Sequence, residues 1–405
     1  MHKINFNRIK YVICSFVAAS MAAVSVFHVI LPDHYTIYEN STFSFSSRYG
    51  NLITTSAGNA GTEEVFAGNR SRFHVDLRLF GFIDIKTVNV EVSEGNEVWV
   101  CGTPLGIKLF TEGVLVVGME RLQAAEGTVC PASSAGLRTG DVIYAVNGQA
   151  VVTNEDIAEI IQNSGGISLT LSIRREEEKM EISLTPAEMN DGSGYKGGFW
   201  VRDSSAGIGT LTFYDEENGT FAGLGHAVCD VDTGDVLPLL SGEIVSASVT
   251  GVVRGVSGNP GELKGIFLDV ASIGILKQNC EAGIYGTMDT VPEGAVSMVI
   301  APKQEVREGS AEILTTVDGA EAKRYTIEIE RINYRDDNPT KNMVIRVTDP
   351  ELLEKTGGIV QGMSGSPILQ DGRLVGTVTH VFVNDATRGY AIFAENMAEI
   401  AEGIE

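Results

Sequence analysis

The feature that most constrains this chain is an uncharged run near its start. The twenty-one residues from Tyr11 to Leu31 contain no Asp, Glu, Lys or Arg, and Lys3, Arg8 and Lys10 precede them. A helix of this length spans a bilayer, and cations before it favour an N-terminus that stays inside. We therefore expect residues 1–10 to be a cytoplasmic n-region and residues 11–31 a membrane anchor, with the rest of the chain exported.

A cleaved signal peptide is the alternative for this segment. Ser20-Met21-Ala22 and Ala22-Ala23-Val24 are poor A-x-A cleavage sites, and the apolar run continues past both. The sequence favours an uncleaved anchor.

The net charge and the cysteines limit which classes of partner and which disulfide pairings are possible. The formal net charge is −23, which argues against nucleic acid as a partner because phosphate binding needs a basic face. Four cysteines lie outside the apolar run, without CxxC spacing, and would allow three disulfide pairings. Buried free thiols are the favoured state.

The segments that follow the apolar run differ in pattern. Residues 32–64 are rich in Ser, Thr, Asn and Gly, which predicts a linker with little structure. Residues 65–92 alternate apolar and polar side chains, as in Phe73, Val75, Leu77 and Leu79, which predicts a small β element.

Residues 93–187 resemble a PDZ domain of the type attached to bacterial proteases. The most specific mark is Ala135-Gly136-Leu137, followed by Gly140-Asp141 and Ile143. Asn147-Gly148 predicts a hairpin, and a helix is expected from about Asn154 to Gln162. The resemblance implies that a peptide or a segment of the chain itself adds as a strand beside a groove. The loop at Leu105, Gly106 and Ile107 would then bind a terminal carboxylate, although both apolar residues also suit a core.

The remaining sequence reads as a further linker, 188–198, and a strand-rich domain, 199–405. Its short strands and tight turns predict a double β-barrel or sandwich. Gly362-Met363-Ser364-Gly365-Ser366-Pro367 lies between apolar runs, as in the loop by which chymotrypsin-like serine peptidases present their nucleophile. Such a loop aims the N–H groups of Gly362 and Ser364 at one point, where an oxyanion would form. Ser366 is interpreted as a loop residue.

A serine hydroxyl needs a base, and this domain has only two histidines, His226 and His380. His226 precedes Ser364 in the chain and has glycine neighbours, which favours it as the base. His380 follows Ser364 by sixteen residues, near the strand expected to line a specificity pocket, and is given a structural role. The aspartate that orients the imidazole is less determined. Asp349 is favoured from spacing alone, with Asp269 as its competitor.

His226, Cys229, Asp230 and Asp232 lie close together in one loop and have side chains that can bind zinc or calcium. No HExxH motif is present, and the aspartates lack the rest of a calcium loop. We expect neither a metal nor another cofactor.

Six motifs occur together in residues 199–405: Trp200-Val201-Arg202-Asp203, Ala206 to Phe213, Leu224-Gly225-His226, Asp230 to Gly234, Pro260 to Leu263, and Gln361 to Pro367. Together they resemble the motifs of the SpoIVB (stage IV sporulation protein B) peptidases. The resemblance implies a serine endopeptidase of endospore-forming bacteria, exported into the space between forespore and mother cell, which cuts itself free. It would then cleave a membrane-bound regulator, releasing an intramembrane protease that activates a sigma factor. His226 matches the family's base, Ser364 its nucleophile and Asp349 its important aspartate. Cys229 departs from the small polar residue expected there.

The sequence thus predicts a mainly β protein with a membrane anchor, a PDZ domain and a chymotrypsin-like double β-barrel peptidase domain. Two alternatives stay open. One is a PDZ adaptor with an inactive protease-like domain, against which the intact Ser364 and His226 argue. The other is an HtrA-like quality-control protease, in which the protease domain would precede the PDZ domain.

Overall fold

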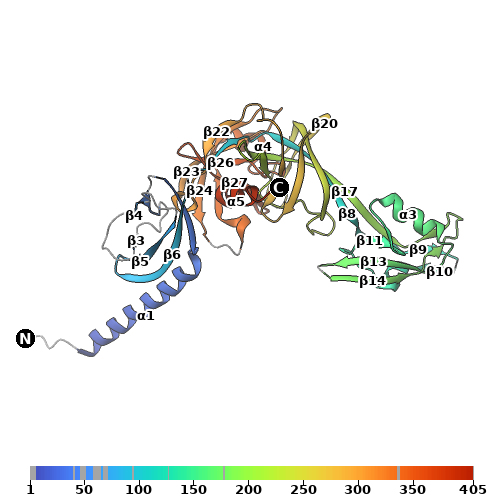
Figure 1. The fold of residues 1–405 in the computed structure, drawn as a ribbon, viewed down its shortest axis with the longest axis horizontal. Coiled ribbons are helices and arrows are strands. Elements are labelled where there is room, and N and C mark those ends of the chain that lie inside the picture. Colours follow the sequence, from blue (N-terminus) through green and yellow to red (C-terminus); the bar gives the residue numbers. More distant parts are fainter. Residues whose placement is uncertain are drawn as a thin grey trace, which may run out of the picture.

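The computed structural model in Figure 1 is elongated, with helix α1 at one end and a small unit around helix α3 at the other. The structure describes residues 6–39, 42–45, 52–57, 65–66, 72–93, 95–125, 127–176, 178–334 and 338–404. Strands predominate throughout this part of the chain, so the predicted mainly β fold class is confirmed.

Helix α1 (Phe6–Ile30) corresponds to the uncharged run. Its 25 residues extend over roughly 37 Å at 1.5 Å per residue, more than the thickness of a hydrocarbon core. By length and composition its Ile13–Ile30 part can cross a membrane, as a signal or an anchor does.

The next segment is folded where the sequence predicts a linker. Strand β1 (His34–Tyr38) pairs in parallel with β6 (Ile83–Ser93), and β3 (Ile53–Ala57) pairs with β5 (Arg72–Leu79). The sheet order is β1-β6-β5-β3, and β2 (Thr42–Phe43) pairs separately with β4 (Val65–Phe66). The prediction of a linker over 32–64 is wrong for the described residues, because buried apolar side chains alternate with the polar ones that suggested it. The rest of that range lies outside the described residues.

This N-terminal sheet packs against the C-terminal part of the chain rather than standing alone. The rings of Phe45 and Tyr334 lie 6.1 Å apart in an edge contact, and Gln304 Nε2 donates to Thr36 O at 2.6 Å. One continuous core includes side chains from both parts.

The unit at the far end has its own core, centred on Ile157, Ile161 and Leu171. Its elements are α2 (Pro131–Ala135), β11 (Val142–Val146), β12 (Gln149–Ala150), α3 (Asn154–Asn163), β13 (Leu169–Arg175) and β14 (Glu178–Leu184). The predicted Asn147-Gly148 hairpin is confirmed, with positive φ at both residues and β11 paired to β12. Short pairs flank this unit: β9 (Leu122–Ala124) with β10 (Gly127–Val129), and β15 (Ala187–Glu188) with β16 (Tyr195–Lys196).

Two closed barrels form the middle of the molecule. The first is a ring of β8 (Pro104–Met119), β19 (Leu239–Val253), β20 (Glu262–Cys280), β21 (Gly283–Thr287), β18 (Thr220–Gly223) and β17 (Phe199–Asp215). Strands β7 (Glu97–Val100) and β22 (Val296–Val299) extend its sheet beyond β17.

The second barrel is closed in the order β23-β24-β25-β28-β27-β26. Its elements are β23 (Gly309–Thr315), β24 (Lys323–Ile332), β25 (Met343–Val347), α4 (Pro350–Thr356), β26 (Pro367–Gln370), β27 (Arg373–Phe382), β28 (Asp385–Phe393) and α5 (Ala394–Ala401). Single 3₁₀ turns occur at Lys303–Glu305 and Pro339–Lys341.

The first barrel and the far unit share two long strands. Strands β8 and β17 pair along most of their length and run from one into the other, as Figure 1 shows. The start of β8 therefore lies in the barrel and β7 in the extension of its sheet, although the sequence places both in a domain of residues 93–187. A strand boundary was not visible there because an apolar run suits either core equally well.

A substitution at Gly106 tests whether the start of β8 lies in the first barrel. A Cβ atom at Gly106 would lie 2.6 Å from Val245 Cγ2 of β19 and 2.7 Å from Phe267 Cδ1 of β20, whereas one at Gly207 on the adjacent strand meets no atom within 4 Å. We expect Gly106→Ala to lower the free energy of unfolding by roughly 1–3 kcal/mol through overpacking. Gly207→Ala is the control and should stay within about 0.5 kcal/mol of the parent. Urea unfolding followed by fluorescence measures both, and equal midpoints would contradict the placement.

Candidate active site

The serine loop lies where the two barrels meet. Gly362 and Gly365 have φ of +94° and +95°, which glycine adopts without strain, and a Cβ atom at Gly365 would collide with Thr210 O. Thr210 of the first barrel donates from its amide to Ser364 O at 3.1 Å and from Oγ1 to Gly362 O at 2.8 Å. The first barrel therefore holds a loop that belongs to the second.

The two serines of this loop differ in environment. Ser364 is half-buried, and its Oγ donates to Thr379 O at 2.8 Å. Ser366 is fully buried, and its Oγ lies 2.8 Å from Thr315 Oγ1. Only Ser364 of the two lines the adjoining cavity.

The backbone N–H groups of the loop fall into two sets. The amides of Met363 and Gly365 donate to Val360 O at 3.1 Å and Val378 O at 2.9 Å. Within the described part of the chain, no carbonyl accepts from the amides of Gly362 and Ser364. These are the two donors expected for an oxyanion.

A cavity of about 580 Å³ adjoins the loop between the barrels. Polar groups that line it include Ser364, His226, His380 and Asp230. Apolar side chains form most of the remaining wall: Ile107, Ile208, Leu224, Val228, Val231, Ile359, Val360, Val381 and Val383.

His226 enters this cavity from the first barrel. The turn after β18 contains Leu224 and Gly225 with φ of +65° and +68°, and a Cβ atom at Gly225 would lie 2.8 Å from Thr377 Cγ2 of the second barrel. The ring Nδ1 is 2.7 Å from Ala227 O. Because a carbonyl oxygen can only accept, Nδ1 carries the proton and Nε2 keeps a lone pair. Burial lowers the pKa of His226, which favours the neutral imidazole that a base requires.

His380 lines the same cavity, although its sequence context favours only a structural role. Its ring centroid lies 5.0 Å from that of His226. Partial burial, followed by the charges of His226 and Lys341, lowers the pKa of His380 to about 4. Its position on a strand near the expected specificity pocket was the signal that could have assigned it to the cavity.

Asp349 is placed differently from the expected third member of a triad. It caps the N-terminus of α4, and its carboxylate accepts from the amides of Glu351 at 2.9 Å, Leu352 at 3.1 Å and Thr326 at 3.2 Å. It does not line the cavity that contains His226. The competitor Asp269 lies in β20, with its side chain outside the described residues.

Leu105, Gly106 and Ile107 also differ from the expected carboxylate-binding loop. All three lie within β8, paired to β17 on one side and to β19 on the other. Leu105 and Ile107 are 1% and 4% exposed. A strand with neighbours on both sides has no free edge for a peptide, so these residues serve the barrel core.

The loop considered for a metal carries ion pairs instead. Arg202 binds the carboxylates of Asp230 and Asp232, the latter at 2.8 Å. Cys229 is exposed, contrary to the expectation of buried thiols, whereas Cys101 is buried. All five cysteines are unpaired.

Comparison with known proteins gives a family match and several partial similarities. The family described as SpoIVB peptidase S55 matches residues 193–398, about half of the chain, and a PDZ domain family matches residues 126–175. Serine protease HTRA1 of Xenopus tropicalis is 41% identical over 59 residues, which cover 15% of this chain and 13% of that protein.

A probable periplasmic serine endoprotease DegP-like of Brucella suis biovar 1 (strain 1330) is 36% identical over 109 residues, covering 25% of this chain and 20% of that protein. The chain thus spans about a fifth or less of the length of these curated relatives. The active form of Rv3671c protease from M. tuberculosis aligns over 48% of this chain and 72% of that one, with 16% identity and a TM-score of 0.27.

The matched family segment contains Ser364, His226 and His380, all of which line the cavity between the barrels. The chain therefore belongs to the SpoIVB peptidase S55 family and carries a PDZ domain.

Proposed function

We propose that this chain is an exported, membrane-anchored serine endopeptidase in which Ser364 is the nucleophile and His226 the base. The observation that carries the proposal is the cavity between the barrels, which Ser364, His226 and Gly362 line together. Among the described residues, no carbonyl accepts from the amides of Gly362 and Ser364. Ser364 Oγ attacks the peptide carbonyl, His226 Nε2 takes its proton, and the two amides stabilise the oxyanion.

The hydroxyl of Ser364 is bonded to a backbone carbonyl of the second barrel and not to His226. Ser364 Oγ donates to Thr379 O, and the hydroxyl must turn to donate to His226 Nε2 before its proton can transfer. Catalytic hydrogen bonds commonly tighten only when substrate binds, so this arrangement fits a site at rest.

The apolar wall of the cavity defines the class of substrate. A peptide with an aliphatic or aromatic side chain beside the cleaved bond would bury it against residues such as Ile208 and Val360. A charged side chain in that position would lose its hydration with little compensation.

Family membership and helix α1 support the cellular role. The enzyme would cleave itself free of its membrane helix and then cleave the ectodomain of a membrane-bound regulator. That cut would release an intramembrane protease and activate a sigma factor during sporulation. A PDZ adaptor with an inactive protease-like domain is the second candidate, and an accessible Ser364 beside His226 argues against it.

The PDZ domain is proposed to hold a segment of its own chain. Phe199 to Arg202 pair with β8 from Met119 to Leu115, and Phe199 and Val201 pack onto the PDZ core. Asp203 Oδ2 accepts from the amide of Asn154 at the start of α3, at 2.9 Å. Strand addition beside a helix is the way in which PDZ domains bind peptides. Arg202 of this segment also binds Asp230 and Asp232 in the loop of residues 227–237, which follows His226 and is called the histidine loop below. A partner peptide that displaced the segment would therefore loosen the histidine loop.

Active-site labelling tests the nucleophile. We expect Ser364→Ala to abolish reaction with a fluorophosphonate and all peptide cleavage, because no other residue takes the role of the nucleophile. Ser366→Ala is the matched control two residues away, expected to remain reactive while losing roughly 1 kcal/mol of stability with its buried hydrogen bond. Labelling of Ser364→Ala, or loss of labelling in folded Ser366→Ala, would refute the assignment.

The pH dependence of labelling tests the base. His226 must be neutral to accept a proton, and burial lowers its pKa below the ordinary 6.5. The labelling rate should therefore still exceed half of its plateau value at pH 6.5 and reach the half-maximal rate only at lower pH. Stopped-time labelling between pH 4 and pH 9, scored against stability at each pH, measures this. A half-maximal rate at or above pH 6.5 contradicts it.

Hydrogen–deuterium exchange tests the segment in the PDZ groove. Val201→Asp puts a charge onto the PDZ core and should expel the segment. Amide exchange should then rise by roughly tenfold or more at residues 115–119, which pair with the segment, and at residues 227–237, which Arg202 holds. Trp200→Asp changes the neighbouring side chain, which is 60% exposed, and should leave both regions as in the parent. Faster exchange at 115–119 alone would disprove the coupling to the histidine loop.

A further inference from the structure

The imidazole of His226 has a partner other than a carboxylate. Its Nδ1 donates to Ala227 O at 2.7 Å. Asp230 is the only acidic residue that lines the described cavity, and its carboxylate is already bonded to Arg202 and to the amides of Asp232 and Thr233, both at 2.9 Å. The ring tautomer is therefore set by a backbone carbonyl.

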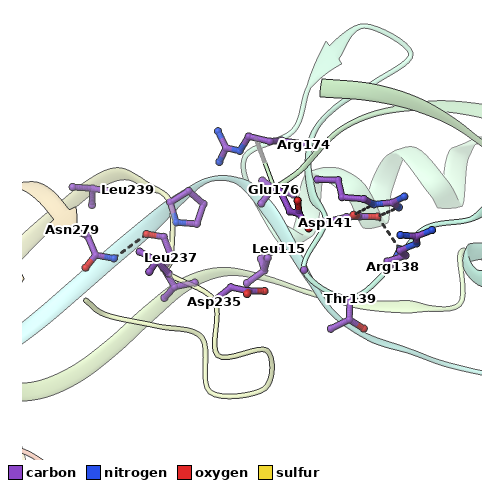
Figure 2. A pocket seen from close by; sticks show the side chains of 15 residues that line it. Leu115, Arg138, Thr139, Asp141, Arg174, Glu176, Asp235, Leu237, Leu239 and Asn279 are labelled. Carbon is purple, nitrogen blue, oxygen red and sulfur yellow. Dashed lines mark hydrogen bonds and ion pairs between the residues drawn. The ribbon is translucent and has the colours of Figure 1, made fainter. Parts of the chain in front are cut away.

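That carbonyl is held in place by Asn279 of β20. The amide that contains Ala227 O also contains the N–H of Val228, which donates to Asn279 Oδ1 at 2.8 Å. Asn279 Nδ2 donates in turn to Val228 O and to Leu237 O, both at 2.9 Å. Figure 2 shows Asn279 directed at Leu237, with the hydrogen bond between them drawn as a dashed line.

These bonds close the base of the loop from both sides. Leu237 N donates to Val228 O at 3.1 Å, so Asn279 binds the two residues at which the loop departs and returns. A hydrogen bond to the N–H of a peptide group also strengthens its carbonyl as an acceptor. Rotation of the 227–228 peptide would break the contact to Asn279 and the contact to the ring together.

We infer that Asn279 is the positioning residue of His226, and that the Ala227 carbonyl takes the place of the aspartate in a Ser-His-Asp arrangement. The inference deepens the proposed function and rests on it for the role of His226. A carbonyl fixes the tautomer without a negative charge, so the imidazolium formed during catalysis is stabilised less than it would be beside a carboxylate.

Nitrogen NMR of the imidazole in the full chain is the primary test. Parent protein with ¹⁵N-histidine should show His226 protonated at Nδ1, and Asn279→Ala should shift this signal toward a mixture of the two tautomers. The maximal rate of fluorophosphonate labelling should fall on the order of 100-fold, the effect of a misplaced catalytic group. The reagent concentration at half-saturation should stay unchanged, because Asn279 does not line the cavity.

Two comparison variants make the outcome specific. Asn147→Ala removes another asparagine that accepts from a backbone amide, that of Thr170 at 2.8 Å, within the PDZ domain. Asn147→Ala should lower the stability and leave both the His226 tautomer and the labelling rate as in the parent. Asp349→Asn can keep the helix cap through Oδ1, while it removes the charge and the bond from Thr326 N, so the tautomer and the rate should again be unchanged.

Folded Asn279→Ala with the parent's tautomer and labelling rate would overturn the inference. A tautomer change in Asp349→Asn would do the same, because it would return the orienting role to the carboxylate. A parent protein whose Ser364 does not react with the fluorophosphonate would refute the proposed function. The NMR signal does not require turnover, so it would still test the role of Asn279 in that case.

Discussion

The antiparallel pairing of β8 with β17 is the interaction on which the rest of the structure depends. Without it the first barrel would remain an open sheet, because this pairing joins the two ends of its ring. The same two strands continue into the PDZ domain and supply one edge of its sheet. Barrel and PDZ domain are therefore parts of one hydrogen-bonded structure, in contrast to two domains joined by a flexible linker.

The active site depends on a second kind of contact, between the barrels. The serine loop belongs to the second barrel, but its carbonyl groups are bonded to Thr210 and to Thr212, both on β17. The histidine belongs to the first barrel and contacts His380 of the second. Any relative movement of the barrels would separate Ser364 from His226, the proposed nucleophile and base, so the buried hydroxyl contacts of β17 fix the distance that the proposed chemistry requires.

The sequence alone predicted much of this arrangement. Composition and alternation predicted a mainly β chain, and the Asn147-Gly148 hairpin followed from local turn chemistry. The serine loop was recognisable because its glycines are required by backbone conformation, which is a local property. The folded state of residues 34–39 and 52–57 was missed, since the polar residues there occupy the outer faces of strands whose pairing partners are distant in sequence.

Other features of the site could not be predicted from local sequence patterns. Sequence spacing favoured Asp349, yet its carboxylate serves a helix cap, and a cap sequence looks the same whether or not a histidine lies nearby. Leu105 and Ile107 suited either of two cores, and only the long-range pairing of β8 decides between them. Asn279 carried no signal at all, because its partners are backbone groups, which have the same chemistry at every position.

The junction between α1 and the N-terminal sheet has a further consequence. Only three residues separate Ile30 at the end of α1 from His34 at the start of β1, and Lys86 of β6 donates to Leu31 O and to Asp33 Oδ1. Three residues extend over about 10 Å at most. With α1 in a bilayer, the barrels would search for substrate by lateral diffusion in two dimensions, at a fixed height and orientation. Cleavage after α1 would convert that search into one in three dimensions.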